Sequence, residues 1–144
     1  MQPPRPTPPV SPMRRVDDHP TLRVILAEDD DVLRETLVEE LIGLGYEVRV
    51  ATNGLELTDA VLDAVHGRMP IPDAIVSDVR MPGATGVEVL EILRRYDWRV
   101  PVVLTTAFPD HELSVEAVRL GACELLEKPL DLLKFREAVS RAVA

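Results

Sequence analysis

Polar residues that could do chemistry follow four short apolar segments of the chain. Asp78 comes directly after the apolar run 74–77 and precedes a loop that contains Pro82 and Gly83. The other three segments end in the same way, at Glu28-Asp29-Asp30, at Thr105-Thr106 and at Glu127-Lys128. A carboxylate where a buried strand meets a loop is held rigidly on one side and is open to reactants on the other. We therefore expect the four segment ends to form one site.

Glu28 and Asp29 are the acidic part of this predicted site. Like charges this close repel each other unless something neutralises them. If Asp78 approaches from a neighbouring strand, three carboxylates converge, and Mg²⁺ is the natural counter-ion because it takes oxygen ligands and keeps several waters. For the acidic run taken alone, the alternative is a solvated loop. Asp31 is predicted to cap the helix that follows.

Lys128 and a threonine hydroxyl supply the remaining groups. A lysine at the mouth of a parallel sheet can pair with a carboxylate or with an incoming phosphoryl oxygen. Of Thr105 and Thr106, the alternation of side chains along a strand favours Thr106 as the donor that faces the site. A carboxylate, a magnesium ion, a hydroxyl and an ammonium together stabilise charge on a transferring phosphoryl group. Asp78 is therefore predicted to accept that group as an acyl phosphate.

The elements that must position these residues alternate between strand and helix from Thr21 onward. Apolar runs predict strands at 22–27, 47–51, 74–77, 100–105 and 123–126, and helical spacing predicts helices at 31–43, 54–65, 85–95, 110–120 and 130–143. Five such repeats with short connections predict an α/β fold with one parallel sheet covered on both faces by helices. Open sheets of this kind place functional groups at the carboxyl ends of their strands, where the polar residues stand.

Length and composition narrow the class of protein further. The 144 residues suffice for one domain, and the net charge of −9 disfavours direct nucleic-acid binding. The apolar runs are too short to span a membrane. The single cysteine, Cys123, excludes an intramolecular disulfide and a zinc finger and suits a reduced, cytoplasmic setting. Seven of the 13 prolines fall in residues 1–20, which are predicted to form a disordered tail.

Four segments of the chain resemble the motifs of the receiver domain of two-component response regulators. They are VILAEDD at 24–30, IVSDVRMP at 75–82, PVVLTTA at 101–107 and LEKP at 126–129. The likeness extends over residues 22–144, and it implies a receiver domain at 21–144. It also implies a flavodoxin-like, doubly wound (βα)5 fold, with a five-stranded parallel sheet in the order 2-1-3-4-5.

The resemblance also implies a role for each residue of the site. Asp78 would accept a phosphoryl group from a sensor histidine kinase or a phosphotransfer protein, in the presence of Mg²⁺. Thr106 would donate a hydrogen bond to that group and Lys128 would form an ion pair with it. The magnesium ligands would be Asp29, Asp78, the backbone carbonyl of Arg80 and, through water, Glu28.

In that family, the threonine moves inward when the phosphoryl group is captured and reshapes the face that partners read. The corresponding face here consists of the predicted helix 110–120, strand 123–126 and helix 130–143. We expect this face to bind a downstream protein, which the sequence does not identify, or a second copy of the chain. We expect no activity as an enzyme beyond self-catalysed phosphotransfer and autodephosphorylation.

The sequence departs from the common receiver pattern at several positions. Leu125 stands where the family usually has Tyr or Phe, so the usual aromatic switch is in doubt. Thr85 replaces an Asp but can still cap the helix that follows. Arg80 and Phe108 flank the expected path of the hydrolytic water, and we expect this bulky pair to prolong the life of the phosphorylated state.

Other classes of protein share parts of this pattern. The spacing of Asp29 and Asp31 permits a haloacid-dehalogenase-like phosphatase, but that class needs a late acidic pair and leaves Asp78 unexplained. A pseudo-receiver, which keeps the fold without phosphorylation, stays open because of Leu125. No glycine-rich loop follows a strand, which excludes P-loop and dinucleotide-binding proteins. A stand-alone regulator is favoured over a fragment of a longer one, because residues 1–20 read like a natural terminus.

Overall fold

A computed structural model describes residues 21–96 and 98–144, and the structural statements below concern those residues. The tail predicted at 1–20 lies outside them. The strands are β1 (Arg23–Ala27), β2 (Glu47–Ala51), β3 (Ala74–Asp78), β4 (Val102–Thr106) and β5 (Glu124–Glu127). The helices are α2 (Asp31–Gly43), α3 (Gly54–Val65), α4 (Gly86–Arg95), α5 (His111–Arg119) and α6 (Leu132–Val143). The predicted alternation of strands and helices is confirmed, with bounds that differ by two residues at most.

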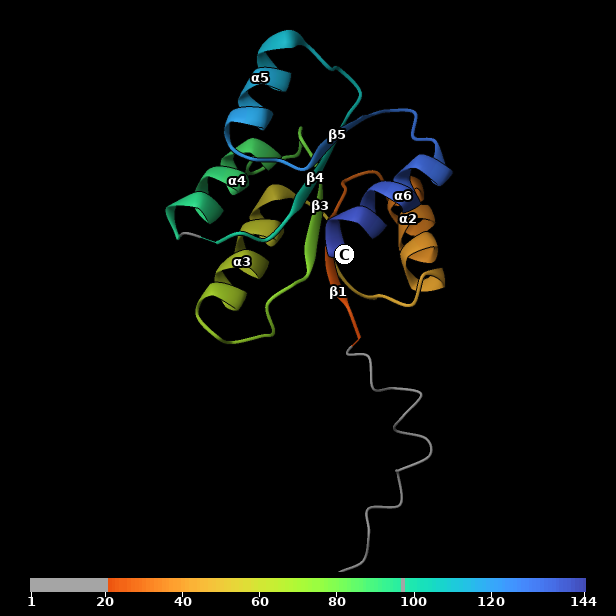
Figure 1. The fold of residues 1–144 in the computed structure, drawn as a ribbon. Helices are drawn as coiled ribbons and strands as arrows, with labels where there is room; N and C mark the ends of the chain where they lie inside the picture. Colours follow the sequence, from red (N-terminus) through yellow and green to blue (C-terminus); the bar gives the residue numbers. More distant parts are fainter. Residues whose placement is uncertain (1–20, 97) are drawn as a thin grey trace, which may run out of the picture.

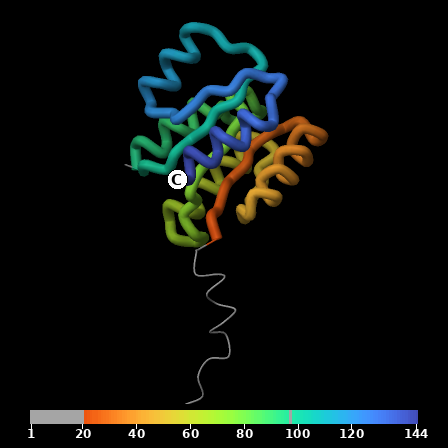
Figure 2. Tube along the Cα trace, turned by 45° about the vertical axis from the view of Figure 1, so that its right-hand side comes forward, coloured from red at the N-terminus to blue at the C-terminus, as the bar shows by residue number. Residues whose placement is uncertain are grey.

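All strands of the sheet run parallel, in the order β2-β1-β3-β4-β5, as predicted. Helices α2 and α6 cover one face of the sheet, and α3, α4 and α5 cover the other (Figure 1). Figure 2 shows the same layers from a direction turned by 45°. The molecule is therefore a three-layer α/β domain with an open sheet, as the right-handed crossover rule requires for strand–helix repeats.

Two hydrophobic cores lie on opposite faces of the sheet because side chains alternate along each strand. In β1, Val24 and Leu26 point toward α2 and α6, whereas Ile25 and Ala27 point toward α3 and α4. A strand covered on both faces needs an apolar side chain at nearly every position. This explains why the strands appeared in the sequence as continuous apolar runs rather than as alternating patterns.

The carboxyl ends of the inner strands lie level with one another. Ala27 is the register partner of both Ala51 in β2 and Ser77 in β3, and Asp78 is the partner of Thr105 in β4. Because the register is set by the strands, residues that directly follow these ends share one edge of the sheet. The polar residues singled out in the sequence therefore lie along that edge.

Helix caps explain where the helices begin. The side chain of Asp30, not that of Asp31, caps α2 by accepting a hydrogen bond from the N–H of Leu33, so the cap predicted at Asp31 was wrong by one residue. Thr85 caps α4 through the N–H of Glu88, as expected. No helix in the part of the chain that the structure describes is long and apolar enough to cross a membrane.

The helices differ in how much of their surface they bury. Helix α3 contributes Gly54, Leu57, Ala60, Val61 and Ala64 to the buried residues, whereas α5 contributes only Ala117. Leu113 of α5 and Leu120, which directly follows the helix, are partly buried against the same core. Since buried apolar area is the main source of packing stability, α5 gains less from core packing than α3.

Candidate functional site

Lys128 joins the two most buried carboxylates at the carboxyl edge of the sheet. Its ammonium lies 2.7 Å from Oδ2 of Asp78 and 2.7 Å from Oε1 of Glu28. The Glu28 side chain is 1% exposed and that of Asp78 is 9% exposed. Buried charges of this kind persist only when they are paired. One ammonium therefore holds together carboxylates from the ends of β1 and β3.

Asp29 completes an acidic cluster with these two residues. One carboxylate oxygen from each of Glu28, Asp29 and Asp78 lies within 4.8 Å of the others, and Asp29 is exposed to solvent. Three carboxylates against the single Lys128 ammonium leave an excess of negative charge. Hard oxygen ligands, partial burial and one solvent-exposed side suit Mg²⁺, which retains part of its water shell. The residues present thus fit the expected ion.

The electrostatics of this cluster follow from burial and from pairing. Burial raises the pKa of Glu28 above its ordinary value, although hydrogen bonds from Lys128 and from the N–H of Asp30 oppose that rise. Burial lowers the pKa of Lys128, but its hydrogen bonds to Asp78 and Glu28 and their charges outweigh burial and raise it overall. Lys128 is therefore a firmly charged counter-ion at neutral pH.

The loop after Asp78 is held in place at both of its ends. The N–H of Arg80 donates a hydrogen bond to Oδ1 of Asp78 (3.1 Å), so the carboxylate is oriented by its own loop. The N–H of Gly54 at the start of α3 donates to the carbonyl of Pro82 (2.7 Å). A Cβ at Gly54 would lie 2.1 Å from the backbone oxygen of Ala84, so only glycine permits this approach.

Thr106 ends β4 and is fully buried. Its hydroxyl oxygen accepts a hydrogen bond from the N–H of Phe108 (3.1 Å). The guanidinium of Arg80 lies 5.7 Å from the centre of the Phe108 ring, in a cation–π contact. The loops after β3 and β4 are therefore connected across the mouth of the site by two side chains that sequence analysis had placed near it.

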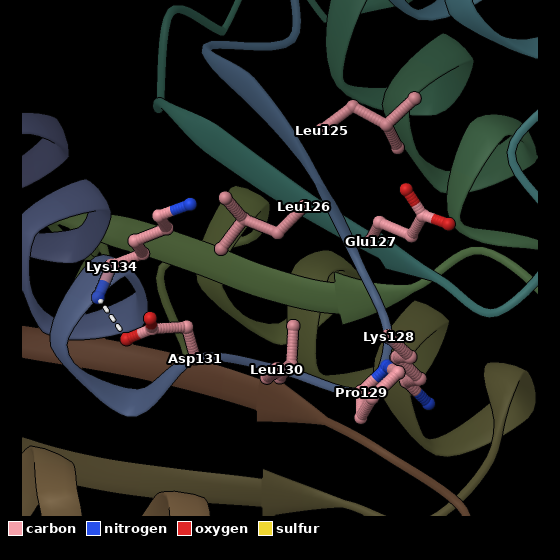
Figure 3. A pocket seen from close by; sticks show the side chains of 8 residues that line it. All are labelled: Leu125, Leu126, Glu127, Lys128, Pro129, Leu130, Asp131 and Lys134. Atoms are coloured by element: carbon pink, nitrogen blue, oxygen red, sulfur yellow. Dashed lines mark hydrogen bonds between the residues drawn. The ribbon is translucent and has the colours of Figure 1, made fainter.

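Leu125, which replaces the usual aromatic residue, lies on β5 beside two cavities of about 400 and about 340 Å³. Figure 3 shows its side chain and that of Glu127 on one side of β5, with Leu126 on the other. Leu125 packs against the core beneath α3, α4 and α5, and Leu126 packs against the core beneath α2 and α6. An aliphatic side chain therefore occupies this position and packs against the core.

The structure brings several of the predicted residues into direct contact. Lys128 contacts Asp78 and Glu28, and Asp29 lies beside both carboxylates. Thr106 lies at the same edge of the sheet, bonded to Phe108. Sequence analysis missed Gly54, whose close approach to the loop after β3 depends on a contact distant in the sequence. Its one local signal was Asn53, which caps α3 directly before it.

An open parallel sheet in the order 2-1-3-4-5 with an acidic site at its carboxyl edge is the arrangement expected of a receiver domain. Residues 24–140 match the family model described as the response regulator receiver domain. The chain belongs to this family.

Relatives of known function and solved structures agree with that membership. The transcriptional regulatory protein ZraR of Klebsiella oxytoca is 35% identical, over 83% of this chain and 26% of its own length. FixJ of Azorhizobium caulinodans is 38% identical, over 77% of this chain and 50% of its own length. The receiver domain of HemR from Leptospira biflexa superimposes with a TM-score of 0.76 at 28% identity, over 86% of this chain and 95% of that one. The chain thus spans a quarter to a half of these curated relatives.

Proposed function

We propose that Asp78 is the phosphoacceptor of a two-component phosphorelay, and that it receives its phosphoryl group from a sensor histidine kinase or a phosphotransfer protein. Receiver domains as a family are phosphoacceptors rather than conventional enzymes. The observation that carries the proposal is the contact of Lys128 with both Asp78 and Glu28, beside Asp29. This arrangement combines a buried carboxylate nucleophile with a counter-charge for the group that it would receive.

In the proposed transfer, an Asp78 oxygen forms a bond to phosphorus while the bond between phosphorus and the donor's histidine nitrogen breaks. The freed imidazole then takes up a proton. Lys128, now hydrogen-bonded to Oδ2 of Asp78, would pair with a phosphoryl oxygen. The Thr106 hydroxyl, which now accepts a hydrogen bond from the N–H of Phe108, would turn toward the site and donate to another phosphoryl oxygen.

Glu28, Asp29, Asp78 and the carbonyl of Arg80 would hold the proposed Mg²⁺. When bound, this ion neutralises charge that develops on the phosphoryl oxygens. The protein's own contribution is to fix the carboxylates, since the N–H groups of Asp30 and Arg80 already orient Glu28 and Asp78 through hydrogen bonds of 3.0 and 3.1 Å. A site whose ligands are oriented in advance loses little entropy when it binds its ion.

The direct test is incubation with acetyl phosphate and Mg²⁺, followed by intact mass measurement of the wild type and of Asp78→Asn. We expect one phosphoryl adduct on the wild type and none on the variant. An adduct on neither protein would favour the pseudo-receiver, the alternative that Leu125 supports. The haloacid-dehalogenase alternative gains no support, because the family match and the contacts of Asp78 both point to a receiver.

A second experiment tests the metal part of the proposal. Lys128→Met removes the ammonium between two buried carboxylates and should lower the free energy of unfolding by about 3 kcal/mol at neutral pH. Mg²⁺ should then raise the urea midpoint of the variant more than that of the wild type, because the acidic cluster has lost its own cation. Lys134→Met, at the only other lysine of the chain and exposed on α6, is the matched control. Equal responses to Mg²⁺ would contradict a metal site at the cluster.

We further propose that the output surface is the face formed by α5, β5 and α6. Val115 and Val118 of α5 and Leu133 of α6 are exposed there, at 51%, 75% and 57%. This face would bind a downstream protein or a second copy of the chain when Asp78 is phosphorylated. The acidic net charge opposes direct nucleic-acid binding by this domain, and the single cysteine fits a reduced, cytoplasmic setting.

A pull-down with phosphorylated protein and with Asp78→Asn tests the output surface. Partners retained only by the phosphorylated form, and lost on Val118→Glu, would support it. Sedimentation of both forms distinguishes a second copy from a different protein. Partners that bind both forms equally would count against phosphorylation as the control.

A further inference from the structure

The carboxyl end of α5 is closed by a Schellman-type turn. Gly121 has φ +81°, its N–H donates to the carbonyl of Val118 (2.9 Å), and the N–H of Ala122 donates to that of Ala117 (2.9 Å). A helix end carries a partial negative charge on its last carbonyl groups, which require donors from elsewhere. The carbonyl of Leu120, the residue that ends the helix, is in this position, and that of Gly121 directly follows it.

Arg94, in the last turn of α4, supplies these donors. Its Nε lies 2.7 Å from the carbonyl oxygen of Leu120, and its Nη2 lies 3.2 Å from that of Gly121. Its third nitrogen, Nη1, lies 2.5 Å from the carbonyl oxygen of Trp98. Hydrogen bonds from a guanidinium are stronger than those between neutral groups, and the planar fork fixes their geometry. One side chain therefore ties the end of α5 to α4 and to the segment before β4.

The amino end of α5 is held differently. It follows the exposed residues 107–110, and the Asp110 side chain caps the helix through the N–H of Leu113, which belongs to the same helix. Ala117 is the one buried residue that α5 contributes, and a cavity of about 340 Å³ is lined by Ser114, Ala117 and Val118 of α5 and by residues of β5. The amino end of α5 is thus capped only from within its own segment, follows an exposed loop, and packs on the core through the partly buried Leu113.

We propose that Arg94 is a positioning residue that acts as the pivot of α5. The inference rests on the proposed function: movement of Thr106 on phosphorylation of Asp78 would pull on the loop 107–110. Because Arg94 anchors the opposite end, α5 swings at its amino end rather than shifting as a whole. The anchor converts a small displacement near the site into a rotation of the exposed face that carries Val115 and Val118.

The anchor itself is tested without phosphorylation, by hydrogen exchange of the amides of Gly121 and Ala122. In Arg94→Met we expect these amides to exchange about tenfold faster or more, because charged donors to the helix end are lost. The control is Arg95→Met, at the adjacent exposed arginine of the same helix turn. Unchanged exchange in Arg94→Met, or equal acceleration in both variants, would overturn the anchor.

The pivot is tested by distances between spin labels in a Cys123→Ser background, which removes the only native thiol. One pair joins exposed Asp59 of α3 to Glu112 near the amino end of α5, and the other joins Asp59 to Val118 near its carboxyl end, each position substituted by Cys. With Arg94 present, acetyl phosphate and Mg²⁺ should change the first distance and leave the second nearly constant. In Arg94→Met both distances should change.

Intact mass measured on the same samples separates two kinds of failure. An adduct on Asp78 together with equal changes of both distances in the Arg94 protein would overturn the pivot and leave the proposed function standing. An adduct with neither distance changing would also overturn it. No adduct on any sample would overturn the proposed function, and with it the pivot, while the exchange experiment still decides whether Arg94 anchors α5.

Discussion

Helices α3 and α5 cover the same face of the sheet, and both begin near its carboxyl edge, but they are held in opposite ways. Helix α3 is fixed at its amino end, where Gly54 contacts the loop after Asp78, and it buries five residues. Helix α5 is fixed at its carboxyl end by Arg94 and buries one. The difference divides the site into a side held by close backbone contact, which carries the carboxylate proposed to react, and a side with less core packing, which we propose moves.

This division suits a protein that must both react and signal. A phosphoacceptor needs its carboxylate in one orientation, because misplacement of reacting atoms lowers the rate. A signalling surface needs two arrangements that differ little in free energy. Placing these needs on different helices allows one domain to meet both.

The largest effect on stability should come from a substitution that disrupts the contact of α3 with the loop after Asp78. Gly54→Ala places a methyl group 2.1 Å from the backbone oxygen of Ala84, and because backbone cannot yield easily, we expect a loss of about 3 kcal/mol in the free energy of unfolding. Urea unfolding measures it. Gly43→Ala, at the end of α2 with nothing within 4 Å of its Cβ, is the matched control and should change stability by less than about 1 kcal/mol. If Gly54→Ala were as stable as the wild type, the close contact between Gly54 and Ala84 would not be what holds the loop after Asp78.

A Val→Ala substitution on α3 and another on α5 should have an intermediate effect on stability, and the pair compares the two helices directly. Val61→Ala on α3, where the valine is 1% exposed, should cost about 2 kcal/mol because it leaves a cavity in the core. Val118→Ala on α5, where the valine is 75% exposed, should change stability by no more than about 0.5 kcal/mol. Thermal or urea unfolding measures both losses. Equal losses of stability in the two variants would contradict the difference in packing between α3 and α5.

The smallest effect concerns the contact that connects the two sides. Phe108→Glu removes the ring beneath the Arg80 guanidinium and places a carboxylate near the path of the hydrolytic water. An exposed cation–π contact is worth about 0.5–1 kcal/mol, so we expect the acyl phosphate to decay about two- to fivefold faster. Decay is followed by mass or by release of phosphate. Leu133→Glu adds the same charge on α6, away from the mouth, and should leave the decay rate unchanged. Equal lifetimes in wild type and Phe108→Glu would refute a shielding role for the pair.

Much of the fold could be predicted because its determinants are local. Strands buried on both faces produce apolar runs such as 74–77, and their strict alternation with helical spacing specifies parallel crossovers. Helix starts were less certain, because Asp30 and Asp31 are chemically equivalent caps and only the backbone conformation decides between them. Asp30 is extended, with ψ 118°, and it is the residue that caps.

The candidate site was predictable to the extent that it lies at strand ends. Asp78, Glu28 and Lys128 converge because the sheet register brings the ends of β1, β3 and β5 to one edge. The contacts of Gly54 with Ala84 and of Arg94 with Leu120 have no such signature. A glycine at a helix start and an arginine in a last turn are ordinary residues at those positions, and their partners lie 30 and 26 residues away. Only the folded chain shows what each one contacts.

The level strand ends have a consequence for which changes of length this chain can accept. Successive side chains of a strand point to opposite faces, so deleting one residue within β3 would turn Asp78 away from Lys128 and move the β3 side chains on one side of the deletion into the opposite core. A residue added to the exposed turn near Gly67, at the opposite edge from the site, would leave every strand in register. Insertions should therefore be tolerated at that turn and excluded from the strands.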